Sequence, residues 1–113
     1  MNNREKGRRY EDAACLWLSR HGHEILERNF YAPGGEIDII SSCGGCIFFS
    51  EVKYRKDLSA GSAEDSVGQI KKHRIRRAAA FYLMEHSKYT DLECEFLVIA
   101  VNGERLRIYR NAF

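Results

Sequence analysis

Residues 35–54 read GEIDIISSCGGCIFFSEVKY, and this stretch decides the fold. It contains two runs rich in β-branched and aromatic residues, 36–42 and 46–54, on either side of Gly44 and Gly45. Two glycines between such runs are typical of a tight hairpin turn. The sequence therefore predicts an antiparallel pair of strands that turns at these two glycines.

The position of the turn also predicts the register of the hairpin, because cross-strand partners follow by counting outward from the glycines. The count places Asp38 opposite Glu51 and Glu36 opposite Lys53. Residues that are directly opposed, or two apart on one strand, share a face of the sheet. We therefore expect these four side chains to form one charged patch.

Asp38 and Glu51 carry like charges, so placing them face to face costs stability, and burial increases the cost. The run 46–54 is apolar on both faces, which predicts a central and partly buried strand. A proton or a cation would relieve the repulsion, and Mg²⁺ accepts one or two carboxylates together with water and phosphate oxygens. The alternative is a surface pair of Glu36 with Lys53, with both acids merely near a sheet edge.

The rest of the chain supplies helices and further strands around this hairpin. Apolar residues at helical spacing predict helices over residues 7–21 and 63–86, and β-rich runs predict strands over 24–31, 93–101 and 105–110. Residues 57–62 are small and polar, which is typical of a loop. The order α-β-β-β-α-β-β predicts an α/β fold with a central mixed sheet flanked by helices, in a single domain over residues 1–113.

The composition excludes several classes of protein. The chain has 113 residues, of which 44% are hydrophobic, and this is enough for one core and excludes a disordered chain. It has no apolar run long enough to cross a membrane and no apolar segment of a signal peptide, so we expect a cytoplasmic protein with no membrane partner. We interpret Cys43 and Cys46 as reduced thiols beside a turn, rather than as a redox pair or half of a zinc site.

Charged residues on the two predicted helices lie near the apolar faces that should cover the hairpin. On the first helix, Glu11 borders the apolar face and can lean over the sheet, whereas Asp12 points nearly opposite. On the second helix, Lys71 and Arg74 occupy positions where an amphipathic helix is normally apolar. Their side chains either snorkel past the sheet to water or extend toward a substrate phosphate.

Basic residues gather at residues 71–77 and near the N-terminus, although the formal net charge is only +2. Local basic patches suggest a polyanion as partner, and a solvated helix face is the alternative. Phosphate contacts from such patches give salt-sensitive, largely sequence-independent binding. The sequence shows no stacking motif that would specify bases, and we interpret Tyr54 as a core or rim aromatic. The candidate phosphate-binding residues are Lys71, Lys72, Arg74, Arg8 and Arg9.

The residues 35–38, GEID, followed by EVK at 51–53, resemble the PD-(D/E)XK signature of restriction-endonuclease-like nucleases. From about residue 7 to residue 101 the chain is similar to the YraN-like family, uncharacterised bacterial proteins placed in that superfamily and close to archaeal Holliday-junction resolvases. The resemblance also covers Arg28 and Asn29. It implies a restriction-endonuclease-like fold and a nuclease that needs Mg²⁺ or Mn²⁺ and acts on DNA, including branched or repair intermediates.

Carried over position by position, the resemblance implies roles for individual residues. Asp38 and Glu51 would be metal ligands, together with the backbone carbonyl of Val52. Lys53 would orient or help to deprotonate the attacking water and stabilise the charge of the transition state. Glu11 resembles the helix-borne glutamate that holds a metal-bound water in resolvase-type members. Glu36 and Lys71 match family positions with less defined roles, and Gln69 is a further candidate near the phosphate.

One position departs from the family pattern, because many relatives read Arg-Phe-Asp-Val where this chain has residues 95–98, EFLV. Leu97 removes any supporting role of that aspartate. A non-catalytic nucleic-acid-binding module that acts with a partner is therefore the alternative function, and a thiol-redox role of the two turn cysteines is a third. A chain of 113 residues also offers a small footprint on DNA, so a homodimer, as in the resolvases, is compatible with this interpretation.

Overall fold

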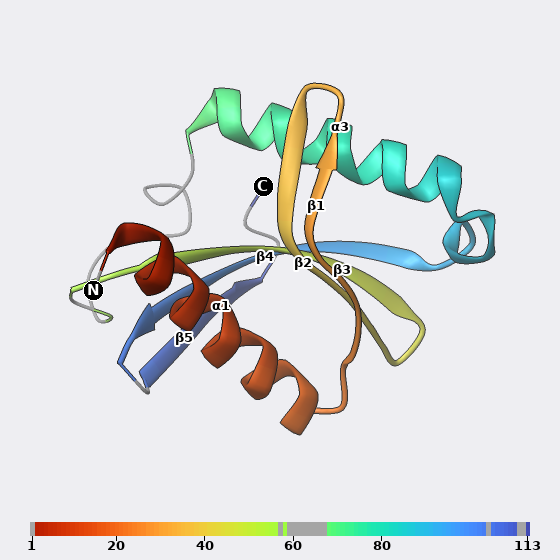
Figure 1. The fold of residues 1–113 in the computed structure, drawn as a ribbon. Coiled ribbons are helices and arrows are strands. Elements are labelled where there is room, and N and C mark those ends of the chain that lie inside the picture. The colour runs from red at the N-terminus through yellow and green to blue at the C-terminus, as the bar shows by residue number, and fades with distance from the viewer. Residues whose placement is uncertain (1, 57, 59–67, 104, 111–112) are drawn as a thin grey trace.

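The β2–β3 hairpin lies in the middle of a five-stranded sheet (Figure 1). A computed structural model describes residues 2–56, 58, 68–103, 105–110 and 113. The strand order is β1-β2-β3-β4-β5; β3 and β4 run parallel, and the other neighbours run antiparallel. The elements are α1 (Asn3–Arg20), β1 (Glu24–Ala32), β2 (Gly35–Cys43), β3 (Cys46–Tyr54), α3 (Gln69–Glu85), η1 (Ser87–Tyr89), β4 (Glu93–Asn102) and β5 (Arg105–Arg110). The predicted α/β fold, with its order α-β-β-β-α-β-β, is confirmed.

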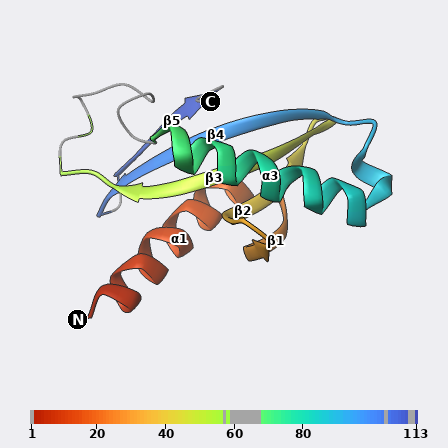
Figure 2. The same cartoon turned by 90° about the horizontal axis from the view of Figure 1, so that it is seen from above.

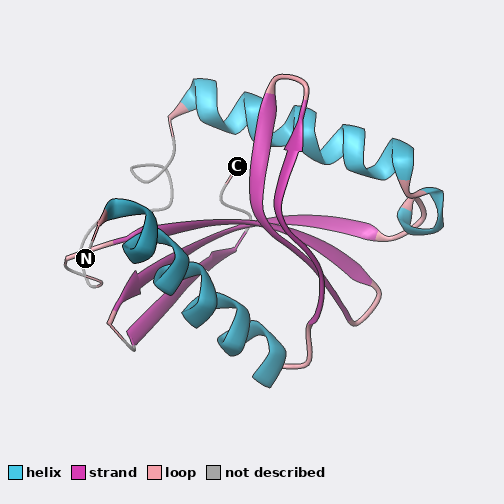
Figure 3. Cartoon of the chain, viewed as in Figure 1, coloured by secondary structure: helices cyan, strands magenta, loops and turns pink. Residues whose placement is uncertain are grey.

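The two long helices cover opposite faces of the sheet, as Figures 2 and 3 show. On one face, α3 packs through Ile75, Ala78 and Tyr82 into a core of buried residues from β1, β2, β3 and β4, and the partly buried Tyr109 of β5 packs against this core. On the other face, α1 packs through Ala14 and Leu18 against β2, β3 and β4. Alternating side chains of the central strands supply both cores, which is why β3 is apolar on both faces.

The β2–β3 hairpin has the predicted register over only part of its length. Cys43 pairs with Cys46 and the ladder continues to Ile39 and Ser50, as the count from the turn predicts. Both turn glycines have positive φ, 57° and 81°, which suits a tight hairpin turn. Beyond Ile39 the two strands part, because β2 continues its pairing with β1 toward the turn at residues 33–34.

Two predicted cross-strand pairs are therefore corrected. Asp38 and Glu51 are not ladder partners, and neither are Glu36 and Lys53. Glu36 pairs instead with Tyr31 of β1, and its side chain is exposed. The four charged residues therefore do not form the regular two-by-two patch that the hairpin register predicts, because the strands separate before reaching them.

The helix boundaries differ from the predictions in ways that have local causes. Helix α1 begins at Asn3 because the side chain of Asn2 accepts a hydrogen bond from the backbone N of Glu5, at 2.9 Å. Helix α3 begins after Gly68, whose backbone is extended. Most of the predicted loop 57–62 and the predicted helical residues 63–67 lie outside the described residues. In the described part of the chain, no helix is long and apolar enough to span a membrane.

Candidate active site

The parting of β2 and β3 brings two carboxylates and a free backbone group together. The backbone N of Val52 has no ladder partner on β2 beyond Ile39, and it donates a hydrogen bond to Asp38 Oδ2 at 2.8 Å. Glu51 precedes Val52, and its side chain is only 4% exposed. Asp38 is half-buried. An acidic pair is thereby held where the sheet opens.

The surroundings of Asp38 disfavour its ionised form. Burial and then the negative charge of Glu51 raise the pKa of Asp38 from 3.8 to about 7, although the Val52 hydrogen bond lowers it. The charge of Glu11 raises the pKa of Asp38 further. A carboxylate in this setting is stabilised by any added cation, and this is the property expected of a metal ligand before its metal binds.

Lys71 of α3 forms an ion pair with Glu51. The lysine side chain is 47% exposed, whereas the glutamate is buried, so the ammonium reaches inward from the surface. Burial lowers the pKa of Lys71, but the hydrogen bond and the charge of Glu51 outweigh burial and raise the pKa. The sequence leaves Lys71 either snorkelling to water or extending toward a substrate phosphate, and the structure places its ammonium on a candidate metal ligand.

Lys53 lies two residues after Glu51 on β3 and therefore on the same face of the sheet. Its side chain is half-buried. Burial and then the positive charge of Lys71 lower the pKa of Lys53, against the opposing charges of Glu51 and Asp38. With a lowered pKa, this amine gives up its proton more readily than an exposed lysine does.

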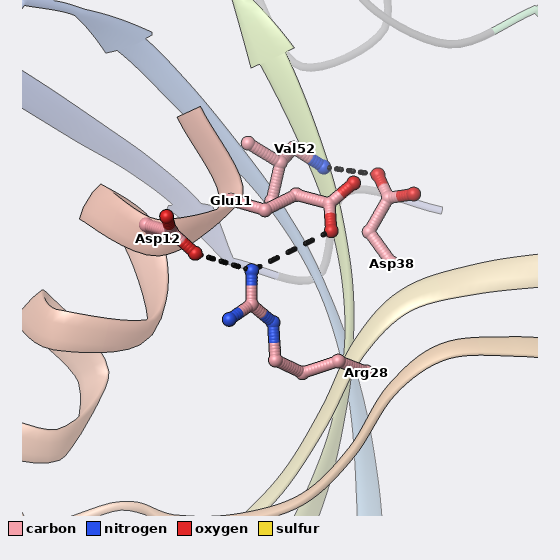
Figure 4. Close-up of polar contacts among 5 residues, drawn as sticks. All are labelled: Glu11, Asp12, Arg28, Asp38 and Val52. Carbon is pink, nitrogen blue, oxygen red and sulfur yellow. Dashed lines mark hydrogen bonds and ion pairs between the residues drawn. The ribbon is translucent and has the colours of Figure 1, made fainter. Parts of the chain in front are cut away.

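Glu11 reaches the site from α1, on which Asp12 is its neighbour (Figure 4). Arg28 of β1 holds both acids, with its Nη2 atom 2.7 Å from Asp12 Oδ1 and 3.8 Å from Glu11 Oε1. Burial raises the pKa of Glu11, while a hydrogen bond with the Asn29 side chain and the charge of Arg28 oppose the rise. Figure 4 shows the Glu11 and Asp38 carboxylates pointing toward one another from helix and strand.

Arg28 and Asn29 are further candidate site residues, whose contacts with Glu11 the sequence does not predict. They hold Glu11, although the sequence marked them only as part of the family resemblance. Asn29 has a φ of 52° and is the one residue other than glycine in the described ranges with positive φ. Asparagine tolerates this left-handed conformation better than most residues. An asparagine within a predicted strand is therefore the sequence feature that could have indicated a break in the strand here.

The donor set fits a hard divalent cation. Asp38, Glu51 and the Val52 carbonyl present oxygen atoms, and Mg²⁺ prefers oxygen donors with only one or two carboxylates from protein. Within the described ranges, no group of three or more His, Cys, Asp or Glu side chains is arranged to hold a metal. The site therefore offers a carboxylate pair rather than a closed cage, and this leaves room for water and phosphate ligands.

A groove of about 720 Å³ lies between α3 and the outer end of the β1–β2 hairpin. Lys71 and Arg74 line it, and Lys71, through its ion pair with Glu51, links the groove to the acidic pair. The hairpin approaches α3 so closely that a Cβ on Gly35 would lie 2.1 Å from the Arg74 carbonyl oxygen. The remaining lining residues are Tyr31, Gly34, Glu36, Gly68, Ile70 and Ile75.

The other expected phosphate-binding residues are spread over different surfaces. Gln69 and Arg74 are exposed on α3, whereas Lys72 is only 8% exposed and faces the interior, because α3 turns this position toward the sheet. Lys72, which the sequence predicts as a phosphate-binding residue, is therefore poorly placed to contact a phosphate at the surface. Arg8 and Arg9 are exposed on α1 and do not line the groove.

Leu97 is buried in the core beneath α1, with 3% exposure. Its ladder partner on β3 is Ser50, whose Oγ atom is buried and has no hydrogen-bond partner among the described residues. An aspartate at position 97 could accept a hydrogen from that hydroxyl, and leucine cannot. The family departure therefore alters packing on the α1 face, opposite Glu51 and Lys53.

Comparison with known proteins supports the resemblance to the YraN-like family. Residues 10–101 match the uncharacterised protein family UPF0102. The UPF0102 protein of Lachnoclostridium phytofermentans is 35% identical over 113 residues, covering 100% of this chain and 96% of the relative. That of Photobacterium profundum is 39% identical over 104 residues, covering 91% and 83%. That of Francisella tularensis subsp. tularensis (strain FSC 198) is 37% identical over 114 residues, covering 100% and 97%.

Proposed function

The chain belongs to the UPF0102 family, and from the geometry of its acidic site we propose that it is a metal-dependent nuclease that hydrolyses phosphodiester bonds in DNA. One observation carries the proposal. The buried Glu51 and the half-buried Asp38 share the opening between β2 and β3, with the half-buried Lys53 on the same strand. Like charges at such a place destabilise a fold, and buried groups with such strongly shifted pKa values are typical of binding and catalytic sites.

Asp38, Glu51 and the Val52 carbonyl would hold Mg²⁺ or Mn²⁺. When bound, such a cation supplies a Lewis acid that offsets charge on the phosphoryl group and acidifies water. The pKa of Asp38, raised to about 7, supports this assignment. A bound cation would offset both the cost of burying this carboxylate and its repulsion from Glu51.

The side chains around the pair supply the remaining needs of hydrolysis. In this reaction water attacks phosphorus, one ester P–O bond breaks, and the leaving oxygen takes up a proton. Lys53, with its lowered pKa, would orient the water and offset the negative charge that develops on the phosphoryl oxygens. Glu11, fixed by Arg28 and Asn29, would accept a hydrogen bond from the water on the side of α1.

The basic groove supports a nucleic acid as substrate. Arg74 is exposed there, and Lys71 is half-exposed, so its ammonium can turn from Glu51 toward a phosphate. Contacts of this kind bind the backbone without reading the sequence. Strong salt dependence and weak sequence preference are therefore expected for binding. A homodimer would enlarge the small footprint of the chain on DNA.

A second candidate function is a nucleic-acid-binding module without turnover. One observation favours it, because Lys71 already neutralises Glu51. The family resemblance adds a second reason, since it implies an aspartate where this chain has Leu97. In this case the acidic pair would be a structural remnant, and replacing Asp38 would leave DNA binding unchanged without removing any activity.

The experiment that separates the two functions is cleavage of labelled duplex, single-stranded, flap and four-way-junction DNA with Mg²⁺ or Mn²⁺. The wild type should cut at least one substrate, and Asp38→Asn should not. Glu95→Gln is the matched control, because Glu95 is also a partly buried strand carboxylate paired with a cation, Arg110, at 2.9 Å. Salt-sensitive binding without cleavage by the wild type would contradict the nuclease and support the binding module.

A further inference from the structure

A second cavity, of about 390 Å³, lies beside the N-terminal half of α1 and the end of β3. Its lining residues are Lys6, Arg9, Tyr10, Tyr54 and Gly103. None of the residues assigned above to metal or water lines it. We call it the tyrosine pocket, and the nuclease mechanism has no use for it.

Two aromatic rings form the apolar part of the tyrosine pocket. Tyr10 and Tyr54 stack with ring centroids 5.3 Å apart and an interplanar angle of 26°. Tyr54 is nevertheless 51% exposed, so the stack covers only part of its ring. A large aromatic surface left open in a pocket is a feature of binding sites rather than of a folded core.

The backbone around Tyr54 is fixed on both sides. Tyr54 pairs with Val101 in the parallel β3–β4 ladder, and the backbone N of the next residue donates to the Val101 carbonyl at 3.1 Å. The Asn102 side chain donates to the Lys56 carbonyl at 2.8 Å. The ring is therefore presented from a held strand end, with Tyr10 behind it, and little conformational entropy is lost when a flat ligand stacks on it.

Positive charge surrounds the rings. Lys6 and Arg9 line the tyrosine pocket, and residues 4–9 carry four basic side chains and one acid. A stacking surface with flanking cations matches one chemical class in particular, a nucleobase joined to phosphate. An apolar peptide side chain would use the rings but not the cations.

The tyrosine pocket adjoins the acidic site through the chain itself. Tyr54 follows Lys53 on β3, and Tyr10 precedes Glu11 on α1. Successive strand residues point to opposite faces, so Tyr54 lies on the α1 face and Lys53 on the α3 face at the same end of the sheet. A strand that passes around this sheet end can contact both places.

We propose that the tyrosine pocket binds one unpaired nucleotide of a DNA strand, with its base stacked on Tyr54 and its phosphate paired with Lys6 and Arg9. As a subsite for the cleaved substrate, this inference rests on the proposed nuclease function. A base inside a duplex is stacked on its neighbours on both faces and cannot offer one to a tyrosine, so the pocket favours DNA with a single-stranded segment. The substrate class is therefore a duplex with an unpaired extension or flap.

The test measures binding without cleavage, in chelator, by fluorescence anisotropy. The probes are a duplex with a short single-stranded extension and the same duplex with blunt ends, and 2-aminopurine replaces one unpaired base to report stacking. Tyr54→Leu should weaken binding of the extended duplex by about tenfold and abolish the quenching, because one stack is lost. Binding of the blunt duplex should not change, and Tyr54→Phe should bind as the wild type does.

Tyr109→Leu is the matched control, because Tyr109 is a half-buried strand tyrosine with an arginine 5.1 Å from its ring centroid and does not line the pocket. Equal losses on both probes, no loss in Tyr54→Leu, or no quenching by the wild type would each overturn the proposal. Quenching by a wild type that cuts no DNA would overturn the nuclease function while retaining the pocket. If the wild type cleaves DNA and Tyr54→Leu binds the extended duplex normally, the pocket proposal is overturned and the nuclease function is retained.

Discussion

Replacing Asp38 by asparagine should stabilise the protein at pH 8 in the absence of divalent metal. The pKa of Asp38 is raised from 3.8 to about 7 in the folded chain by burial and by Glu51. The folded protein therefore holds this proton more tightly than the unfolded chain. As the pH rises from 3.8 toward 7, the unfolded state loses its proton first, and the wild type loses stability across that window.

The magnitude follows from the shift, because each pKa unit corresponds to about 1.4 kcal/mol and the shift is about three units, or about 4 kcal/mol as an upper limit. Asparagine removes the charge, retains a similar shape, and still accepts a hydrogen bond from the Val52 backbone N. Since Asp38 and Glu51 share the cost, we expect a gain of about 2–4 kcal/mol at pH 8. The gain should be small near pH 4 and vanish below about pH 3, where the wild-type carboxyl is protonated in both states.

Urea unfolding of both proteins at several pH values between 4 and 8, in chelator, measures this difference. Saturating Mg²⁺ should then stabilise the wild type and leave Asp38→Asn unchanged, because binding to the folded state alone raises its stability. A variant that is less stable than the wild type at pH 8, or a difference that does not depend on pH, would refute the reasoning about the buried acidic pair.

Substitutions at three further positions, Lys71, Gly35 and Ser50, test how the sheet and its helices pack. Lys71→Met should destabilise the protein by about 2 kcal/mol, because it leaves Glu51 buried without its cation, and adding Glu51→Gln should restore most of the loss in urea unfolding. Gly35→Ala should lower the free energy of unfolding by more than about 2 kcal/mol, because its Cβ would overlap the Arg74 carbonyl. Gly7→Ala lies in open space on α1 and should raise the free energy of unfolding by about 0.5–1 kcal/mol. Thermal melting of both variants distinguishes these outcomes. Ser50→Ala should leave stability unchanged or raise it by about 1 kcal/mol in the same assay, because its buried hydroxyl has no partner among the described residues, and a clear loss would show a bond that this account lacks.

The fold could be predicted from local features of the sequence. The two turn glycines and the two-sided apolar run of β3 specify the central hairpin and its buried place. The start of α1 was misplaced by four residues because the cap depends on one Asn2 side chain rather than on apolar spacing. The pattern of alternating residues also extended the hairpin too far, because nothing local shows where β2 leaves β3.

The candidate site could be predicted only as a set of residues, and its contacts could not. Asp38 and Glu51 stand out as acids in apolar strands, but the Lys71 ion pair and the Arg28 contacts join elements that are distant along the chain. Lys72 and Lys71 are neighbours with the same charge, and only the packing of α3 shows that one is buried and the other half-exposed. Which of these charged side chains is buried, and which partner it contacts, depends on how the helices pack on the sheet.

The most direct test of the nuclease assignment is the initial rate of DNA cleavage by wild type, Glu51→Gln and Glu95→Gln under one set of conditions with Mn²⁺. The assignment predicts metal-dependent cleavage by the wild type and Glu95→Gln, and a loss of at least about 100-fold in Glu51→Gln, the order seen when one charge-stabilising group is removed. Circular dichroism should show all three proteins folded. Equal rates for Glu51→Gln and wild type would contradict the assignment.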